Sequence, residues 1–189
     1  EKVLIKKSGT NKFRTVYIYS LKDRLVLGVL YHCLNEEYKD SICDYCYSYK
    51  EGVNTAKAIR VLRHQQIHNM YGVKLDIHAY FNSVSEQYLH KTIDELFPTI
   101  SGFKKTIEQF MYDNRCRFKG EVIDEYKALI AGTATARFFA NYCLRELDFS
   151  FYNANKIYAR YSDDIIFFNT TKEENDKDLE YIKDCLKER

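Results

Sequence analysis

The chain has 189 residues, of which 46% are hydrophobic and 30% are charged, with one proline and seven glycines. This profile is that of a globular protein long enough to bury a core, and it excludes disordered and fibrous chains. The net charge of +2 permits contact with nucleic acid but does not by itself favour it, because such binding depends on cations gathered on one face.

The first elements predicted along the chain are a basic hairpin and two helices. β-type runs at residues 3–5 and 15–18 flank a linker with turn formers and four cations, which predicts a hairpin. Such a hairpin is suited to a triphosphate, since Arg binds phosphate bidentately and Lys acts as a point charge; a solvated loop is the alternative. Apolar spacing predicts helices at residues 21–34 and 56–67, the second capped by Asn54 or Thr55. Residues 35–53 read as irregular.

The middle of the chain alternates a short strand with helices. A strand at residues 73–77 carries Asp76 near its end. Ser83 and Glu86 have capping-box spacing and predict the start of a helix that Pro98 ends. A second amphipathic helix covers residues 103–110, and the basic stretch around residues 114–120 reads as a loop. Apolar spacing then predicts one long helix over residues 132–151.

Two adjacent carboxylates mark the end of the chain. Runs at residues 156–161 and 165–169 read as strands joined by a tight turn, with Ser162, Asp163 and Asp164 at its tip, and a charged helix follows from residue 172. Adjacent like charges cost free energy unless a cation neutralises them, and oxygen ligands suit Mg²⁺ or Mn²⁺. The alternative is an ordinary surface turn, in which Asp and Ser are common.

A second strand that carries a carboxylate favours a metal site over an ordinary surface turn. If the strand holding Asp76 pairs beside the hairpin of Asp163 and Asp164, three carboxylates converge on one sheet edge. Two divalent ions about 3.5–4 Å apart can there activate a 3′-hydroxyl and stabilise a leaving pyrophosphate. Strands separated by helices in this order predict an α+β fold with a small antiparallel sheet packed on helices.

The compartment is predicted from cysteines and hydropathy. Six cysteines lie scattered among apolar neighbours, which is typical of a reduced, cytoplasmic protein and not of a disulfide framework. No apolar run reaches the roughly 18 residues of a membrane helix, and no signal peptide is present, so no membrane contact is expected. The chain opens on Glu1 and stops inside a helical pattern, and we expect it to be an excerpt of a longer protein.

Five segments, in order along the chain, carry a resemblance to a known family. Residues 6–24 combine a basic hairpin with a helix start, and residues 47–62 form a second segment of the same region. Residues 75–81 read LDIHAYF, residues 138–148 read FFANYCLRELD after Gly132, and residues 161–164 read YSDD. Together they resemble the fingers and palm of a reverse transcriptase, of the bacterial type seen in group II introns, retrons and antiviral defence systems.

The resemblance implies an architecture and an activity. Residues 1–70 would form the fingers and residues 71–189 the palm, with some fingers elements within 98–128 and no thumb in this stretch. The activity implied is RNA-directed DNA polymerisation, in which deoxynucleotides are added to a 3′-end by two-metal-ion phosphoryl transfer. Mg²⁺, with Mn²⁺ as the alternative, is the implied cofactor. The implied partners are an RNA template, a DNA or RNA primer and deoxynucleoside triphosphates; a homo-oligomer or a protein partner is left open.

The resemblance also assigns roles to residues. Asp76, Asp163 and Asp164 would be the catalytic metal ligands, with the Ile77 carbonyl as a fourth. Phe81 stands where the family places the aromatic ring that clashes with a ribose 2′-hydroxyl; an ordinary core phenylalanine is the alternative. The nucleotide-binding residues implied are Lys7, Lys12, Arg14, Phe81, Ala131 and Gly132.

One departure from the family leaves template use open. Where the family has Pro-Gln-Gly, this chain has Ile130, Ala131 and Gly132, and Ala131 cannot donate the hydrogen bonds that a glutamine makes. The departure resembles the defence-associated branch, some of whose members extend DNA without a template or start from a protein hydroxyl.

Two functions other than DNA polymerisation remain as alternatives. One is an RNA-templated RNA polymerase or nucleotide cyclase on a similar palm, against which Phe81 argues. The other is a catalytically silent nucleic-acid-binding scaffold, which gains nothing from clustered negative charge near phosphates.

Overall fold

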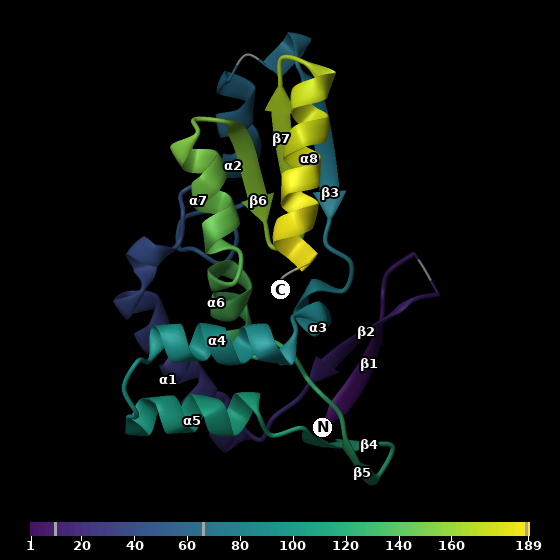
Figure 1. Ribbon diagram of the computed structural model, residues 1–189. Coiled ribbons are helices and arrows are strands. Elements are labelled where there is room, and N and C mark those ends of the chain that lie inside the picture. The colour runs from purple at the N-terminus through teal and green to yellow at the C-terminus, as the bar shows by residue number, and fades with distance from the viewer. Residues whose placement is uncertain (10, 66, 188) are drawn as a thin grey trace. The chain divides into compact units, whose positions relative to one another are not determined.

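The chain forms helices and three small antiparallel sheets in a computed structural model that describes residues 1–9, 11–65, 67–187 and 189 (Figure 1). The strands are β1 (Lys2–Lys6), β2 (Phe13–Tyr17), β3 (Tyr71–Asp76), β4 (Arg115–Phe118), β5 (Glu121–Asp124), β6 (Ile157–Tyr161) and β7 (Asp164–Asn169). The α-helices are α1 (Leu21–Glu37), α2 (Thr55–His64), α3 (Tyr80–Ser83), α4 (Glu86–Leu96), α5 (Gly102–Met111), α6 (Ala134–Tyr142), α7 (Arg145–Asn153) and α8 (Lys172–Lys187). Two 3₁₀-helices are η1 (Lys39–Ser41) and η2 (Ile67–Asn69).

Contacts divide the chain into two units, each built from two stretches of sequence. Unit 1 comprises residues 1–37 and 81–139, and unit 2 comprises residues 38–80 and 140–189. The boundaries predicted for fingers and palm rest on the family resemblance and not on these contacts, so they stay a prediction.

Unit 2 is a three-stranded antiparallel sheet in the order β3-β7-β6, with α7 and α8 on one face and α2 on the other (Figure 1). Side chains alternate between the two faces of a strand. Phe167 points toward the α7 side, where the Phe151 ring lies 5.9 Å from it and stacks 4.5 Å from Tyr158. On the other face, Ala159 packs with Leu62 of α2. Burial on both faces explains why β7 reads as a continuous apolar run.

Unit 1 combines the β1–β2 and β4–β5 hairpins with α1, α4, α5 and most of α6. Leu27 and Leu30 of α1 meet Ile107 and Met111 of α5 and Phe139 of α6, and these side chains are buried. The amphipathic spacing predicted for α1 and α5 is therefore what packs this unit.

The β4–β5 hairpin corrects the sequence prediction of a basic loop around residues 114–120. Arg115 pairs with Asp124 and Phe118 with Glu121. Lys119 and Gly120 both have positive φ, 53° and 91°, which is the backbone of a two-residue type I′ turn. Cations at alternate positions of β4 had masked its strand pattern.

The long helix predicted over residues 132–151 is also corrected, because it is two helices. α6 ends at Tyr142 and α7 begins at Arg145. The Asn141 carbonyl accepts from Arg160 Nη2 at 3.3 Å and the Tyr142 carbonyl from Arg145 Nη1 at 3.2 Å. Side chains thus take up carbonyls that a continuous helix would use.

Helix starts were predicted with mixed success. Asn54 caps α2, since its side chain accepts from the Lys57 N–H at 3.0 Å, which settles the choice between Asn54 and Thr55. The capping box at Ser83 is wrong: Ser83 belongs to α3, and Ser85 caps α4 by accepting from the Tyr88 N–H. α2 also ends at His64, short of the predicted residue 67; residue 66 lies outside the described residues.

All six cysteines are free thiols. Within the part of the chain that the structure describes, no helix combines the length and apolarity needed to cross a membrane.

Candidate active site

The edge of the unit 2 sheet brings the predicted metal ligands together at the backbone. β3 pairs antiparallel with β7, and Asp76 stands directly opposite Asp164. The Ile77 N–H continues this pairing by donating to the Asp163 carbonyl at 3.0 Å. The pairing expected for the Asp76 strand is therefore present. Like charges directly opposite each other are destabilising in a sheet, so this arrangement needs a compensating cation.

The turn between β6 and β7 is shorter than predicted. Its tip consists of Ser162 and Asp163, and Asp164 already belongs to β7. Ser162 has φ of 58°, a left-handed conformation that costs a residue other than glycine about 1–3 kcal/mol and persists where surrounding contacts hold it. A positive φ at the first of two turn residues is the pattern of a type II′ turn, which suits the twist of a hairpin.

The carboxylates already face one cation from their own sheet. Lys74 lies two residues before Asp76 and therefore on the same face of β3, and its Nζ is 2.9 Å from Asp164 Oδ1. The pKa of Lys74 is raised, first by its hydrogen bond to and attraction by Asp164 and further by Asp76 and Asp163. All three carboxylates therefore act on this ammonium group.

The donor chemistry fits Mg²⁺ or Mn²⁺, because carboxylate and carbonyl oxygens are the ligands that these ions prefer. The Ile77 carbonyl accepts from the Tyr80 N–H at 3.3 Å and keeps a second lone pair for a metal. Among the described residues, no three Asp, Glu, His or Cys side chains gather closely enough to hold an ion. The Lys74–Asp164 pair is solvent-exposed on both sides, and such pairs are weak enough for a divalent ion to replace.

Three of the six predicted nucleotide-binding residues, Phe81, Ala131 and Gly132, lie in one loop of unit 1 or bond to it. The Ala131 carbonyl accepts from the Tyr17 N–H of β2 at 2.7 Å, and the Phe81 carbonyl accepts from the Leu129 N–H at 3.1 Å. Arg14 lies two residues before Val16 on β2, on the strand face that meets Gly132.

Gly132 is required by the structure of this loop. Its φ is 103°, and a Cβ there would lie 3.1 Å from the Tyr17 carbonyl oxygen and 3.3 Å from Val16 Cβ. Ala128 and Ile130 also have positive φ, 46° and 53°. Such clustered strain is typical of functional loops. The close approach that the glycine permits is to β2; its approach to a nucleotide stays a prediction.

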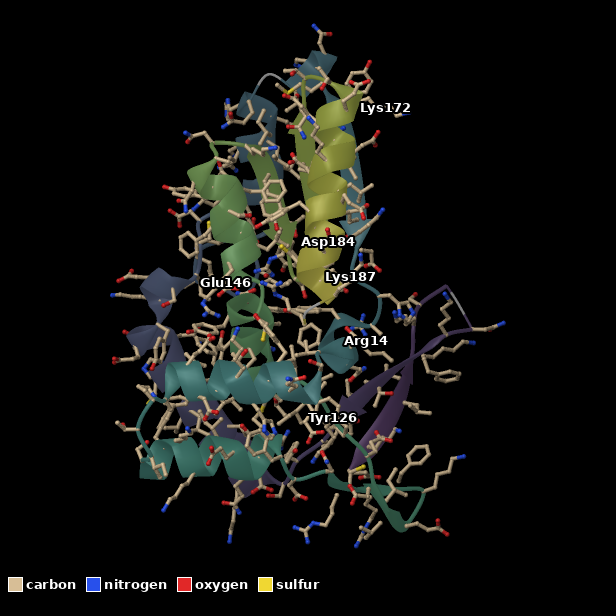
Figure 2. All side chains as sticks on the ribbon, viewed as in Figure 1. Arg14, Tyr126, Glu146, Lys172, Asp184 and Lys187 are labelled. Carbon is tan, nitrogen blue, oxygen red and sulfur yellow. The ribbon has the colours of Figure 1, made fainter. Side chains whose placement is uncertain are left out.

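The cations of the β1–β2 hairpin are solvent-accessible. Lys7, Lys12 and Arg14 are exposed. Arg14 lies on β2 (Figure 2), and the two lysines lie at the hairpin loop, where the Lys7 N–H donates to the Lys12 carbonyl at 2.9 Å. Their exposure is compatible with contact to an anionic ligand in solution.

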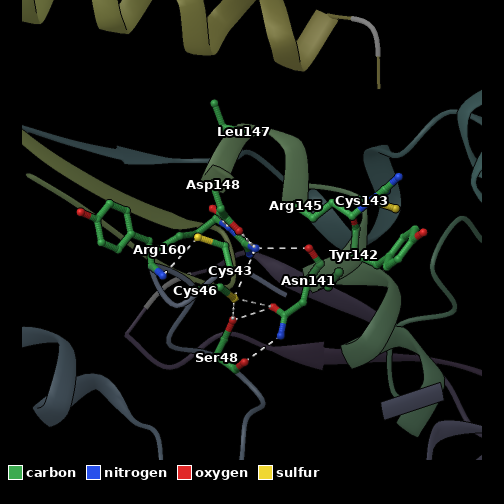
Figure 3. A network of polar contacts seen from close by, with 12 residues as sticks. Cys43, Cys46, Ser48, Asn141, Tyr142, Cys143, Arg145, Leu147, Asp148 and Arg160 are labelled. Carbon is green, nitrogen blue, oxygen red and sulfur yellow. Dashed lines mark hydrogen bonds and ion pairs between the residues drawn. The ribbon is translucent and has the colours of Figure 1, made fainter. Parts of the chain in front are cut away.

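A buried polar network beneath the carboxylate turn was not predicted (Figure 3). Arg160 and Asp148 are both 0% exposed and pair bidentately, Nε to Oδ1 at 2.8 Å and Nη2 to Oδ2 at 2.6 Å. Burial disfavours the charge of Arg160, but the attraction of Asp148 and the hydrogen bonds to it, together with smaller contributions from other neighbours, raise the pKa of the guanidinium. The sequence signal for this pair was a charged residue in each of two apolar segments, one basic and one acidic. Charged residues are rarely buried unless they are paired.

Asn141 and Ser48 complete this network. Asn141 Nδ2 donates to the Ser48 carbonyl at 2.7 Å, and Ser48 Oγ donates to Asn141 Oδ1 at 2.8 Å. Asn141 is 3% exposed, so its role is structural and not that of a nucleotide ligand.

Comparison with known proteins identifies the family. The family model described as "Reverse transcriptase (RNA-dependent DNA polymerase)" matches residues 5–189. The chain belongs to the reverse transcriptase family. Members of that family are nucleotidyltransferases, which confirms the predicted enzyme class. No curated protein matches the sequence.

A solved structure supports the fold of this reverse transcriptase domain. An apo telomerase from Candida tropicalis, truncated from its C-terminal domain, matches with a TM-score of 0.57 at 15% sequence identity. The match covers 99% of this chain and 46% of that one, so the chain spans less than half of its structural neighbour. The predicted α+β, reverse-transcriptase-like fold is confirmed.

Proposed function

We propose that this domain is the catalytic part of an RNA-directed DNA polymerase that adds deoxynucleotides to a 3′-end. The observation that carries the proposal is the placement of Asp76 opposite Asp164, with Asp163 in the adjoining strained turn. Two carboxylates opposite each other destabilise a sheet by their charge, and together with Asp163 they supply the oxygen ligands that divalent metal ions prefer. Membership of the reverse transcriptase family supports the reaction class.

The residues proposed to hold the metal are Asp76, Asp163, Asp164 and the Ile77 carbonyl. When bound, Mg²⁺ or Mn²⁺ would activate the 3′-hydroxyl and stabilise the charge of the leaving pyrophosphate. The chain itself contributes the pairing of β3 with β7, which places the backbones of Asp76 and Asp164 opposite each other.

The proposed nucleotide contacts come from the fingers hairpin and the loop before α6. Arg14 would bind the triphosphate bidentately, with Lys7 or Lys12 as an added point charge. Phe81 would exclude a ribose 2′-hydroxyl, and Ala131 and Gly132 would line the base-pair side. Partners in this proposal are an RNA template, a DNA or RNA primer and deoxynucleoside triphosphates.

We also propose the subtype of reverse transcriptase, its compartment and its domain boundaries. The segments at residues 75–81 and 161–164 support a bacterial type similar to group II intron, retron or defence enzymes, acting in the cytoplasm. Residues 1–70 would be fingers and residues 71–189 palm, with fingers elements within 98–128.

The test is deoxynucleotide incorporation by purified full-length protein on an RNA template with an annealed primer, with Mg²⁺ or with EDTA. Asp163→Asn should abolish incorporation, because it removes one metal-binding charge at constant size. Asp40→Asn, which removes an exposed charge in η1, should leave the rate unchanged. Incorporation that persists in Asp163→Asn or in EDTA would contradict the proposal.

A second candidate is template-independent or protein-primed DNA synthesis. The observation that favours it is Ala131, which offers no side-chain hydrogen bond and whose carbonyl is already bonded to Tyr17. Incorporation with a single deoxynucleotide, measured with and without a homopolymer RNA template, separates the two. A rate that ignores the template supports the second candidate.

Discrimination between deoxyribonucleotides and ribonucleotides distinguishes both of these DNA-synthesis candidates from an RNA polymerase. If Phe81 excludes the 2′-hydroxyl, Phe81→Ala should raise the incorporation of ribonucleotides relative to deoxynucleotides about 10-fold or more. An unchanged ratio would assign Phe81 to the core alone.

A further inference from the structure

We infer that Ser48, Asn141 and Arg160 form a positioning network that holds the backbone of Ser162 and so fixes where Asp163 and Asp164 stand. The inference rests on the proposed function in one respect, the role of these two carboxylates as metal ligands. None of the three positioning residues is itself proposed to touch metal or substrate.

Both peptide groups of Ser162 are bonded to network side chains. The Ser162 N–H donates to Ser48 Oγ at 3.0 Å, and the Ser162 carbonyl accepts from Arg160 Nη1 at 3.1 Å. Ser162 is 5% exposed. Water therefore cannot replace these bonds, and removing a partner leaves a buried polar group unsatisfied.

Ser48 and Arg160 are in turn bonded to side chains of α6 and α7. The Asn141 side chain of α6 bonds the hydroxyl and the carbonyl of Ser48. Asp148 of α7 binds Arg160 bidentately. The segment before Ser48 is also bonded to β6, since the Tyr47 N–H donates to the Arg160 carbonyl at 2.8 Å. The fork geometry of the guanidinium leaves Nη1 pointed at the turn.

The strained backbone of Ser162 explains why supporting hydrogen bonds are needed at this position. A serine at φ of 58° would relax unless its surroundings over-determine it. Asp163 follows Ser162 directly, and Asp164 opens β7, so rotation of the Ser162 peptide would redirect both carboxylates. The network is thus the support that orients the proposed ligands, as second-layer partners do in metal sites.

The decisive variant is Ser48→Ala, with Tyr158→Phe as its matched control. Each removes one buried hydroxyl from the network. The Tyr158 hydroxyl, however, bonds Asp148 Oδ1 at 2.8 Å and does not contact the turn, and Arg160 keeps its other bonds to Asp148. The two variants therefore separate loss of positioning from general loss of stability.

Three quantities should be measured on full-length protein. They are hydrogen–deuterium exchange at the Ser162 amide, Mn²⁺ affinity by titration without nucleotide, and kcat and KM for a deoxynucleoside triphosphate. Ser48→Ala should speed the exchange and lower Mn²⁺ affinity and kcat by about 10- to 100-fold, with KM nearly unchanged. Tyr158→Phe should change each by less than about twofold, because the bonds to Ser162 remain.

A second variant tests the same inference in case the Ser48→Ala protein does not fold. Arg160→Met combined with Asp148→Leu replaces the buried pair by apolar residues, an exchange that is often neutral for stability. It still removes the bond from Arg160 Nη1 to the Ser162 carbonyl, so Mn²⁺ affinity should fall as in Ser48→Ala.

Unchanged exchange and Mn²⁺ affinity in a folded Ser48→Ala protein would overturn the inference. An equal loss in Tyr158→Phe would overturn it as well, because stability alone would then explain the effect. The exchange measurement needs neither metal nor nucleotide. It therefore tests the positioning even if Asp163→Asn retains activity and the proposed function fails.

Discussion

Lys74 is the residue that most directly controls charge at the proposed metal site. Its Nζ lies 2.9 Å from Asp164 Oδ1, and attraction by Asp164, and then by Asp76 and Asp163, raises its pKa. The ammonium group therefore neutralises part of the charge that a metal would otherwise neutralise. A divalent ion and Lys74 compete for the same carboxylate.

Lys74→Met should strengthen Mn²⁺ binding. The substitution removes the competing cation and keeps the length of the side chain, so affinity should rise by about two- to fivefold at low salt, with a smaller gain at high salt. Titration of Mn²⁺ without nucleotide measures it. Lys177→Met, at an exposed position on α8, is the control, and weaker binding in Lys74→Met would contradict the competition.

Gly132→Ala should destabilise unit 1. The φ of 103° and the 3.1 Å approach of a Cβ to the Tyr17 carbonyl predict a loss of about 1–3 kcal/mol in the free energy of unfolding. Gly28→Ala is the matched control in α1, where a Cβ meets nothing within 4 Å and should add about 0.5–1 kcal/mol. Urea denaturation measures both. Equal effects would show that backbone conformation at Gly132 carries no strain.

Among the elements, the two hairpins of unit 1 are joined at Glu125. Lys2 of β1 pairs with one carboxylate oxygen, and the Tyr17 hydroxyl of β2 donates to the other at 2.6 Å. Burial raises the pKa of Glu125, but the hydrogen bonds from Lys2 and Tyr17 outweigh it and bring the pKa below its usual value. The ionised carboxylate is thus what holds β1 and β2 to the end of β5.

Glu125→Gln should lower stability in a pH-dependent way. A carboxylate whose pKa is lower in the folded state stabilises the fold above its unfolded pKa and loses that contribution as pH falls through the folded pKa. The deficit of the variant should be about 1–2 kcal/mol at pH 7 and should shrink below about pH 4.5. Urea denaturation across pH measures it, with Glu121→Gln on exposed β5 as the control. A deficit that does not change with pH would contradict this origin.

For the whole molecule, metal binding should be linked to folding. β3 and β7 bring Asp76 and Asp164 opposite each other only in the folded chain, so an ion that binds there stabilises the folded state by mass action. Mg²⁺ at ten times its dissociation constant should raise the free energy of unfolding by about 1.4 kcal/mol.

Chemical denaturation in Mg²⁺ and in EDTA measures this linkage. Asp164→Asn should remove the difference, because it removes a ligand at constant size, whereas Asp40→Asn should keep it. A midpoint that is the same in Mg²⁺ and EDTA for the parent protein would contradict a metal site on this sheet.

Much of the fold could be predicted because the signals are local. Runs of β-branched and aromatic residues mark β6 and β7, the Asn54 side chain caps α2, and Pro98 follows the end of α4. Each depends on residues within a few positions of one another. The motifs at residues 75–81 and 161–164 likewise indicated the family that the comparison with known proteins confirmed.

Other features depend on residues that are distant in sequence. Arg160 takes the Asn141 carbonyl, which helps to divide one amphipathic pattern into α6 and α7. Asp148, which reads as the end of a helix face, is the buried partner of Arg160. No local pattern shows which of two helices a strand arginine will meet, because the pairing exists only after the layers pack.

The α+β class and the three carboxylates could be predicted from the sequence, because periodicity and residue type are local properties, and the resemblance of its motifs indicated the reverse transcriptase family. Three features became visible in the packed fold alone: Asp76 stands opposite Asp164, Lys74 pairs with Asp164, and Ser48 and Arg160 bond the backbone of the strained Ser162 turn. These contacts join segments far apart in the chain, and burial decides their strength: polar groups without access to water must find partners in the fold.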